Sequence, residues 1–494
     1  MCSQLLRRHA RSASVGLALL GLVALVLRMP PPLPTARHAI DLAGAPPPLP
    51  VEVWPVPYPP SPAGGVVALT LPDVDRTLAD QSLADGTLHH LATLAAGGIW
   101  AEQLQVPPYR SAWQTQAALA TGQGDSLPVG GWAAWPEGPA SADECVLWEA
   151  WRRSAPAVWA QAEAQGLRAA LLFWPEMAPP ACAPAASLQV DGLVQDLPAA
   201  LVEVALSPAA GWQNMPHSYS PPLGGLIRVT DAEGQVQARV HLLALDRRND
   251  GVDLPDHFVL ALDRDAGEGA ALFRVDAWID VELLPGLGSG AAFRVLSVSG
   301  GDRPTVTLYR SPSYHLQGRP ADALQRLQAA VGPPSPPADL EAWDRGWLSA
   351  AQVQEMALRS NEWLRRAVQH LYSAGEADLL WVRWWPLDSA RGALAHMSPD
   401  AAQGERSLLR NLDGELAALL RSVDLARTSV LVLSEGSAGD PGPGDGFLVA
   451  AGRGVRQGVA VGRLRATDIV PLLLELLGLP PSGGMPGLDA LLAP

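Results

Sequence analysis

The sequence predicts an α/β fold, in which a doubly wound, mostly parallel sheet lies between helices and carries a β-rich inserted subdomain. Two patterns along the 494 residues predict it. Short apolar runs alternate with helical segments, as in parallel strands that are buried on both faces. Residues 186–312 differ, because their short segments alternate apolar with polar residues between turn residues. We therefore expect one α/β domain over residues 66–490, including a β-rich insertion at about 186–312.

The part of this domain before the insertion is predicted to contain two strands and two helical stretches. The run "GGVVALTLPDVD" at 64–75 is apolar and ends in polar turn residues, which is typical of a buried parallel strand. Residues 82–98 are predicted to form a helix closed by a Gly-Gly pair. Residues 141–166 are predicted to be helical, and "LRAALLFWPE" at 167–176 to form the next strand.

The C-terminal part of the domain repeats this alternation. Two apolar runs, "ARTSVLVLSEG" at 426–436 and "GFLVAAGRGV" at 446–455, are predicted to be buried strands. Residues 466–487, "ATDIVPLLLELLGLPPSGGMPG", are predicted to form a helix that ends at prolines. Strands and helices that alternate in this way favour a mostly parallel sheet covered on both faces.

Residues 1–28 are predicted to be an N-terminal signal anchor or, alternatively, a signal peptide. The apolar run from Val15 to Leu27 suits a signal-peptide core, and the uncharged stretch from Ser12 would span roughly 24 Å as a helix. Arginines at both ends can reach the membrane surface, and a cleavage site at 43–45 would lie unusually far downstream. The basic flank predicts a membrane-anchored or secreted protein whose main domain is extracytoplasmic.

Composition indicates a stalk after the N-terminal segment and limits the partners and the chemistry that the chain can have. Residues 29–65 are rich in proline and are predicted to form a semi-rigid stalk. The net charge of −15 argues against nucleic acid as a partner. The chain contains no lysine, which excludes Schiff-base chemistry and a P-loop. Cys2 precedes the apolar run, and Cys145 and Cys182 form either a disulfide or two unrelated thiols.

Nine segments, in this order along the chain, resemble the type I phosphodiesterase/nucleotide pyrophosphatase branch of the alkaline phosphatase superfamily. They span about 66 to 487 and read "VVALTLPDVD", "SAWQTQAALATGQ", "QGLRAALLFWPE", "AWIDVEL", "VTLYRSPSY", "ADLLWVRWWPLDSARGALAHM", "TSVLVLSEGS", "GFLVAAGRGV" and "ATDIVPLLLELLGLPPSGGMPG". The resemblance implies an alkaline-phosphatase-like α/β sandwich. It also implies two metal ions, usually zinc, held by six Asp and His ligands around a Thr or Ser nucleophile that attacks phosphorus.

The nucleophile position of the resembled family is not occupied by a hydroxyl. Counted back from the "TG" of "ALATGQ", the position falls on Ala112. Ser111 is adjacent and is the candidate catalytic residue, although its use would require a shift of the loop by one residue. Alternatively, Ser111 is a loop or N-cap serine before a helix.

The metal-ligand positions of the family are only partly kept. The first ligand falls on Pro72, which leaves Asp73 as a displaced candidate, and Asp388 stands where the family has an aspartate. Glu435 of "SEGS" replaces the aspartate of the family's "SDHG" signature. The histidine positions hold Gly392 and Gly436, and no histidine follows His396. The candidate metal ligands are therefore Asp73, Asp388 and Glu435.

The remaining histidines and aspartates are predicted to be structural or solvated. The paired histidines of a presumed surface helix and those of the insertion are expected to form ordinary hydrogen bonds (His89, His90, His217, His241, His257 and His315). The run "DRRNDGVDLPD" lacks EF-hand spacing and is expected to be a solvated turn (Asp246, Asp250, Asp253 and Asp256).

These observations predict a catalytically inactive member of the resembled family at the cell envelope. No cofactor is expected, since the imidazoles that suit zinc are missing. The expected partners are the membrane, through the N-terminal helix, and a small anionic ligand or an envelope protein. One alternative is an active phosphodiesterase or phosphatase with a rearranged site, which would use Ser111 and a divalent metal such as Zn²⁺, Mg²⁺ or Mn²⁺. The other is an envelope module that binds protein through the β-rich insertion.

Overall fold

The computed structural model describes residues 65–74, 76–105, 112–123, 156–174, 186–267, 270–397, 401–436, 445–480 and 490–493. All of them belong to one compact unit, Pro57–Pro494. The predicted anchor, almost all of the predicted stalk, Ser111, Cys145 and Cys182 lie outside the described residues. Within the described residues, no helix has the length and apolar character needed to cross a membrane.

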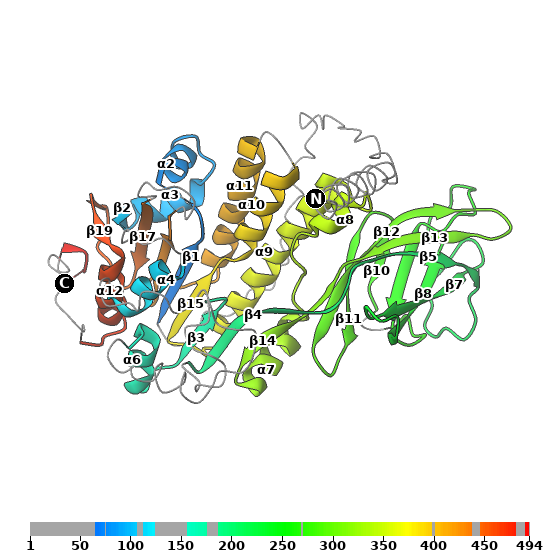
Figure 1. Cartoon of the computed structure of the whole chain (residues 1–494), viewed down its shortest axis with the longest axis horizontal. Coiled ribbons are helices and arrows are strands. Elements are labelled where there is room, and N and C mark those ends of the chain that lie inside the picture. Colours follow the sequence, from blue (N-terminus) through cyan, green and yellow to red (C-terminus); the bar gives the residue numbers. More distant parts are fainter. Residues whose placement is uncertain are drawn as a thin grey trace, which may run out of the picture. The chain divides into compact units, whose positions relative to one another are not determined.

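The centre of the larger sheet is parallel. The described residues form a 14-stranded sheet, in which the neighbours β16, β1, β15, β3 and β4 pair in parallel (Figure 1). Their bounds are Ser429–Ser434, Val66–Leu71, Leu379–Arg383, Ala169–Leu172 and Leu188–Leu197. Every residue of β1, β3 and β16 is buried, as expected for apolar strands that are covered on both faces.

The two flanks of this sheet are partly antiparallel. On one side β17 (Gly446–Gly452) pairs antiparallel with β16 and with β2 (Ile99–Gln105). Beyond them β18 (Val459–Val461) and β19 (Leu464–Arg465) run parallel to β2. The predicted parallel arrangement is therefore confirmed for the centre of the sheet only. The segment between β16 and β17 is too short for a helical crossover, so the chain returns antiparallel.

Helices cover both faces of the parallel centre. Val67 and Leu69 of β1 face one apolar cluster, whereas Val66 and Ala68 face the other. The first cluster is completed by α2 (Arg76–Ala84), α3 (His89–Ala96), α7 (Ala321–Val331), α9 (Ala350–Ser373), α10 (Pro386–Met397) and α11 (Ala401–Leu420). The second is completed by α4 (Ala112–Thr121), α6 (Val158–Ala164) and α12 (Ile469–Leu476). This is the doubly wound arrangement that the sequence predicts.

Two predicted helices differ from those observed. The helix expected at 82–98 is divided into α2 and α3, because Gly86 has a φ of 78° and Asp85 accepts a hydrogen bond from the Thr87 N–H. Both features belong to a turn and interrupt the helix. The helix expected over 466–487 begins with a 3-10 turn, Ala466–Asp468, and α12 ends before Gly478, whose φ is 75°.

The β-rich part forms a sandwich. A 5-stranded antiparallel sheet contains β6 (Ser207–Pro208), β7 (Leu223–Thr230), β8 (Val236–Leu245), β9 (His257–Ala261) and β10 (Leu272–Arg274). Opposite it, the larger sheet is extended by β14 (Ser313–Arg319), β12 (Ser289–Ser299), β13 (Thr305–Arg310), β5 (Ala200–Ala205) and β11 (Trp278–Leu284). The inward side chains of both sheets share one apolar cluster.

Polar contacts fasten this sandwich to α9. Trp278 Nε1 and Arg294 Nη1 both donate to Glu355, the former over 3.0 Å, and the Arg294 guanidinium also lies over the Trp278 ring. One turn further along α9, Arg359 forms an ion pair with Asp280 at 2.5 Å. Near these pairs, α8 (Leu340–Asp344) adds apolar contacts to a small cluster around Tyr309.

Candidate functional site

The three predicted metal ligands follow neighbouring parallel strands. Asp73 follows β1 after one intervening residue, Glu435 comes directly after β16, and Asp388 lies in the first turn of α10 after β15. In an open α/β sheet, ligands bind beyond the carboxyl ends of the strands, where these three positions lie. Ser111, the candidate nucleophile, lies outside the described residues, and Ala112 is the first residue of α4.

An arginine lies between two of these carboxylates. Arg383 is the last residue of β15, and its Nη1 is 2.7 Å from Asp388 Oδ2. Its Nε is 3.2 Å from Glu435 Oε1, and its Nη2 donates to Glu435 Oε2 at 3.5 Å. One guanidinium therefore bridges the carboxylates that follow β15 and β16. A buried charge of this kind is stable only when it is paired and hydrogen-bonded.

Burial and neighbouring charges shift the pKa values of the side chains at this site. Burial raises the pKa of Glu435 above its usual range, and Arg383 and Gln116 only partly offset it. Burial likewise raises the pKa of Asp388, against the opposing effect of Arg383. For Arg383, burial opposes the charge, but Glu435 and Asp388 outweigh it and hold the guanidinium pKa above its ordinary value. Arg383 is therefore a permanent cation at this site.

Helix α4 contributes a further hydrogen-bond donor to Glu435. Gln116 Nε2 lies 3.1 Å from each oxygen of the Glu435 carboxylate, and both side chains are buried. Gln116 and Arg383 were not predicted as site residues. A charged residue at the end of the buried run "ADLLWVR" was the one available signal, since such a residue needs a partner.

Asp73 lies in a turn beyond the strand. Its φ of 55° takes it out of the extended backbone, so the alternation of β1 no longer determines where its side chain points. Its carboxylate lies close enough to Asp388 to raise the Asp388 pKa, a smaller effect than burial. Its carbonyl oxygen accepts a hydrogen bond from Arg391, which also pairs with Glu405 at 2.5 Å. The structure thus brings Asp73, Asp388 and Glu435 to one end of the sheet.

The residues at this end do not fit a pair of zinc ions. Zinc sites rely on imidazole, thiolate and carboxylate ligands, and here the Arg383 guanidinium fills the space between two of the carboxylates. Within the described residues, no group of three or more His, Cys, Asp or Glu side chains is arranged to hold a metal ion. A metal-binding role for Asp73, Asp388 and Glu435 stays a prediction from the sequence.

The other histidines and the aspartate-rich run are engaged in local contacts. Four histidines lie within hydrogen-bonding or ion-pairing distance of aspartates (His90 with Asp413, His257 with Asp256, His315 with Asp196 and His396 with Asp344). His241 accepts from Arg264, and His217 packs against Tyr219. The run 246–256 is not fully solvated as expected: Asp246 is buried, and its carboxylate accepts from the Arg248 N–H at the start of the loop.

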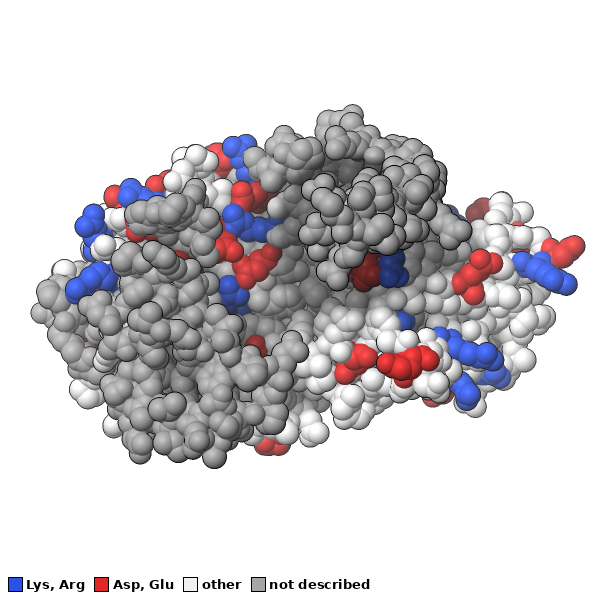
Figure 2. All heavy atoms as spheres, in the orientation of Figure 1, with Lys and Arg blue, Asp and Glu red and all other residues white. Residues whose placement is uncertain are grey.

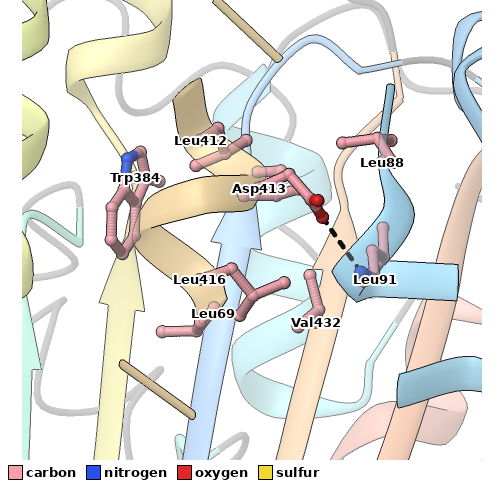
Figure 3. A pocket seen from close by; sticks show the side chains of 9 residues that line it. Leu69, Leu88, Leu91, Trp384, Leu412, Asp413, Leu416 and Val432 are labelled. Carbon is pink, nitrogen blue, oxygen red and sulfur yellow. Dashed lines mark hydrogen bonds between the residues drawn. The ribbon is translucent and has the colours of Figure 1, made fainter. Parts of the chain in front are cut away.

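A small cavity lies in the core rather than at the carboxyl ends of the strands. It measures about 10 Å³ and is surrounded mainly by leucines, with Trp384 and Val432 (Figure 3). The Asp413 carboxylate at its wall points toward α3, where it accepts from the Leu91 N–H (Figure 3). A cavity of this volume holds at most one water molecule, so it is a packing defect and not a ligand site.

Comparisons with known proteins give remote likenesses only. No family model matches the chain, and no curated protein matches it. Among solved structures, the PsFucS1 sulfatase from Pseudoalteromonas sp. has a TM-score of 0.40 at 13% identity, covering 87% of this chain and 72% of that one. The phosphonate monoester hydrolase SpPMH from Silicibacter pomeroyi has a TM-score of 0.34 at 11% identity, covering 87% and 77%. The putative sulfatase yidJ from Bacteroides fragilis has 0.36 at 8% identity, covering 88% and 79%. With TM-scores below 0.5, these likenesses carry no argument about function.

Proposed function

We propose that the chain is a catalytically silent member of the type I phosphodiesterase/nucleotide pyrophosphatase branch of the alkaline phosphatase superfamily. It would keep the fold as a binding or structural module at the cell envelope, tethered by residues 1–28 and the proline-rich segment. The nine ordered segments support the family, and the basic and apolar N-terminal pattern supports the location.

The contact that carries the proposal is the bridge of Arg383 to Asp388 and Glu435. In the resembled family, divalent cations neutralise the carboxylates at the ends of these strands. Here a guanidinium from the same sheet neutralises them, and it offers no open coordination position to a phosphate oxygen. Carboxylates outnumber Arg383 at this end of the sheet, so a small anion is not the ligand that this site favours.

A second candidate function is an active hydrolase with a rearranged site. It is favoured by Asp388 Oδ1, a buried atom without a hydrogen-bond partner among the described residues, and by the Asp73 carboxylate nearby. Asp73 and Asp388 would hold a single divalent ion, Zn²⁺, Mg²⁺ or Mn²⁺, and Ser111 would be the nucleophile. Such an ion would polarise a phosphate ester.

One experiment separates the two candidates. The full chain is purified without chelator, its bound metal is measured by mass spectrometry, and hydrolysis of a chromogenic phosphodiester is followed with added Zn²⁺, Mg²⁺ or Mn²⁺. The silent site predicts no stoichiometric metal and no turnover. Turnover that is abolished in Ser111→Ala but kept in Ser407→Ala, a change at an exposed serine of α11, would establish the rearranged hydrolase instead.

A further inference from the structure

Exposed large apolar side chains gather on the β-rich insertion. Among the described residues, all of the large hydrophobic side chains that are exposed lie between Leu201 and Leu287. The described α/β part of the protein has none of them. Exposed apolar side chains that adjoin one another mark a site of interaction, whereas singly exposed ones are ordinary.

Three of these side chains lie on loops at one end of the sandwich. Tyr219, Val252 and Leu254 are 56%, 51% and 38% exposed. The Tyr219 N–H donates to the Asp246 carbonyl oxygen at 2.8 Å, which joins the segment before β7 to the loop after β8. The Leu254 side chain lies against the turn between β12 and β13, where a Cβ on Gly300 would be 2.9 Å from Leu254 Cδ2. We call residues 217–219, 250–254 and 300–303 together the loop tip.

Hydrogen bonds order the backbone of the loop tip. Asp250 Oδ1 accepts from the Val252 N–H at 3.0 Å, and the Leu254 N–H donates to the Val252 carbonyl oxygen at 2.8 Å. Arg247 Nη1 donates to the His217 carbonyl oxygen at 2.8 Å. The loop is therefore ordered by its own polar groups, and Val252 and Leu254 are not needed for a core. An ordered apolar surface loses little conformational entropy when it is covered.

The charges around the loop tip have both signs. The exposed side chains at its rim are those of Arg247, Asp250, Asp253, Asp302 and Arg303. Figure 2 shows acidic and basic side chains next to each other on the visible face of the insertion. The chain as a whole carries a net charge of −15, so two copies repel one another over most of their surface. A contact between two copies about a twofold axis needs a patch that is complementary to itself, which apolar residues inside a rim of both signs provide.

We propose that the loop tip is a contact surface for a second copy of this chain. Tyr219, Val252 and Leu254 of each copy would meet at the centre, and rim arginines of one copy would face rim aspartates of the other. A rim of mixed sign does not select an anionic membrane or a polyanion, either of which would call for a basic patch. The proposal does not depend on whether the site at the carboxyl ends of the strands is silent.

The test is the concentration dependence of sedimentation velocity, measured on the full chain in one detergent for all variants. Any association through residues 1–28 is then common to every sample. Val252→Ser combined with Leu254→Ser removes the apolar centre, and Arg303→Asp alters only an exposed turn charge. Leu287→Ser is the matched control, because this exposed leucine adjoins Gly288, at the opposite end of the insertion beside Gln328.

We expect the wild-type chain to self-associate, and both loop-tip variants to weaken the association at least about tenfold while Leu287→Ser leaves it unchanged. A wild-type chain that stays monomeric at high concentration overturns the proposal. So does an association that Leu287→Ser weakens as much as the loop-tip variants do. Binding of the wild type to anionic vesicles that is lost in the Val252 and Leu254 variant would assign the loop tip to a membrane instead.

Discussion

Arg383, which is partly buried, and Arg310, which is buried, have opposite electrostatic surroundings, which makes them a natural pair of variants. Arg383 pairs with two carboxylates, whereas Arg310 is 2% exposed and donates to the carbonyl oxygens of Ser311 and Pro198, with no carboxylate in ion-pairing distance among the described residues. Burial lowers the pKa of Arg310 to about 10, an effect that Tyr309 only partly offsets.

We therefore expect Arg383→Met to cost about 3–5 kcal/mol of unfolding free energy, since it leaves the buried Glu435 carboxylate without a cation. Arg310→Met removes a buried charge that has no partner of opposite sign, and should cost about 1 kcal/mol or less. Urea unfolding of both variants measures the difference. Equal losses would show that the carboxylates at the carboxyl ends of the strands do not depend on Arg383.

A second prediction concerns the same carboxylates once the arginine is gone. In Arg383→Ala, the side chains of Asp73, Asp388 and Glu435 remain without the guanidinium that bridged two of them. A divalent cation that binds the folded state only should then recover about 1–3 kcal/mol of stability. Thermal unfolding with added Mg²⁺, Ca²⁺ or Zn²⁺ measures this, with wild type and Arg310→Met as controls. A cation effect of the same size in the controls would contradict a local origin.

At the scale of elements, one residue of α11 caps another helix. Asp413 is buried and accepts from the N–H groups of His90 and Leu91, each at 2.9 Å, at the start of α3. Residue Leu88, at the N-cap of α3, provides no side-chain acceptor. We expect Asp413→Ala to cost about 1–3 kcal/mol, since it leaves helix N–H groups unsatisfied and enlarges the cavity beside it. Asp80→Ala, at an exposed carboxylate of α2, is the control and should change stability by less than about 0.5 kcal/mol.

The packing of α9 on α11 predicts a pH dependence. Glu415 of α11 pairs with Arg365 of α9 at 2.6 Å, and burial raises the Glu415 pKa more than Arg365 lowers it. A carboxyl group whose folded pKa is raised contributes stability below its unfolded pKa and loses it as pH rises through the folded pKa. Wild type should therefore lose stability relative to Glu415→Gln as pH rises from about 4.3 through that window. Urea unfolding across this range tests it, and an exposed change, Glu341→Gln, should show no such slope.

The elements themselves were largely predictable, whereas their polar partners were not. A strand that is covered on both faces needs a continuous apolar run, and "SVLVLS" is such a run. The structure has it as β16, with every residue buried. The division of α2 from α3 depends on one glycine with positive φ, and the antiparallel return of β17 depends on a short connection. Arg383 and Glu435 lie 52 positions apart, and Asp413 lies more than 300 positions from the helix it caps. Nothing local in either sequence segment specifies such a partner.

At the scale of the whole molecule, the sandwich and the α/β part are joined through Glu355. This residue accepts from Trp278 and Arg294, and Arg294 is buried. The other carboxylate near Arg294 is that of Asp276, whose Oδ1 lies 3.7 Å from Arg294 Nε and whose side chain is largely exposed. Removing Glu355 therefore leaves a buried guanidinium held mainly by the Trp278 ring, and we expect Glu355→Ala to cost about 2–3 kcal/mol.

This cost should fall on one part of the protein, because the apolar core of the sandwich is separate from the two cores that flank the parallel strands. Native-state hydrogen exchange in Glu355→Ala should quicken in β11 and β12, while the central strands β1 and β16 keep their protection. Glu282→Ala, at an exposed carboxylate of β11, removes a charge but keeps the contacts of Glu355. It should leave the exchange rates of both regions unchanged. Equal acceleration in β1 and β12 would mean that the sandwich and the α/β part unfold as one cooperative unit, with Glu355 supporting both.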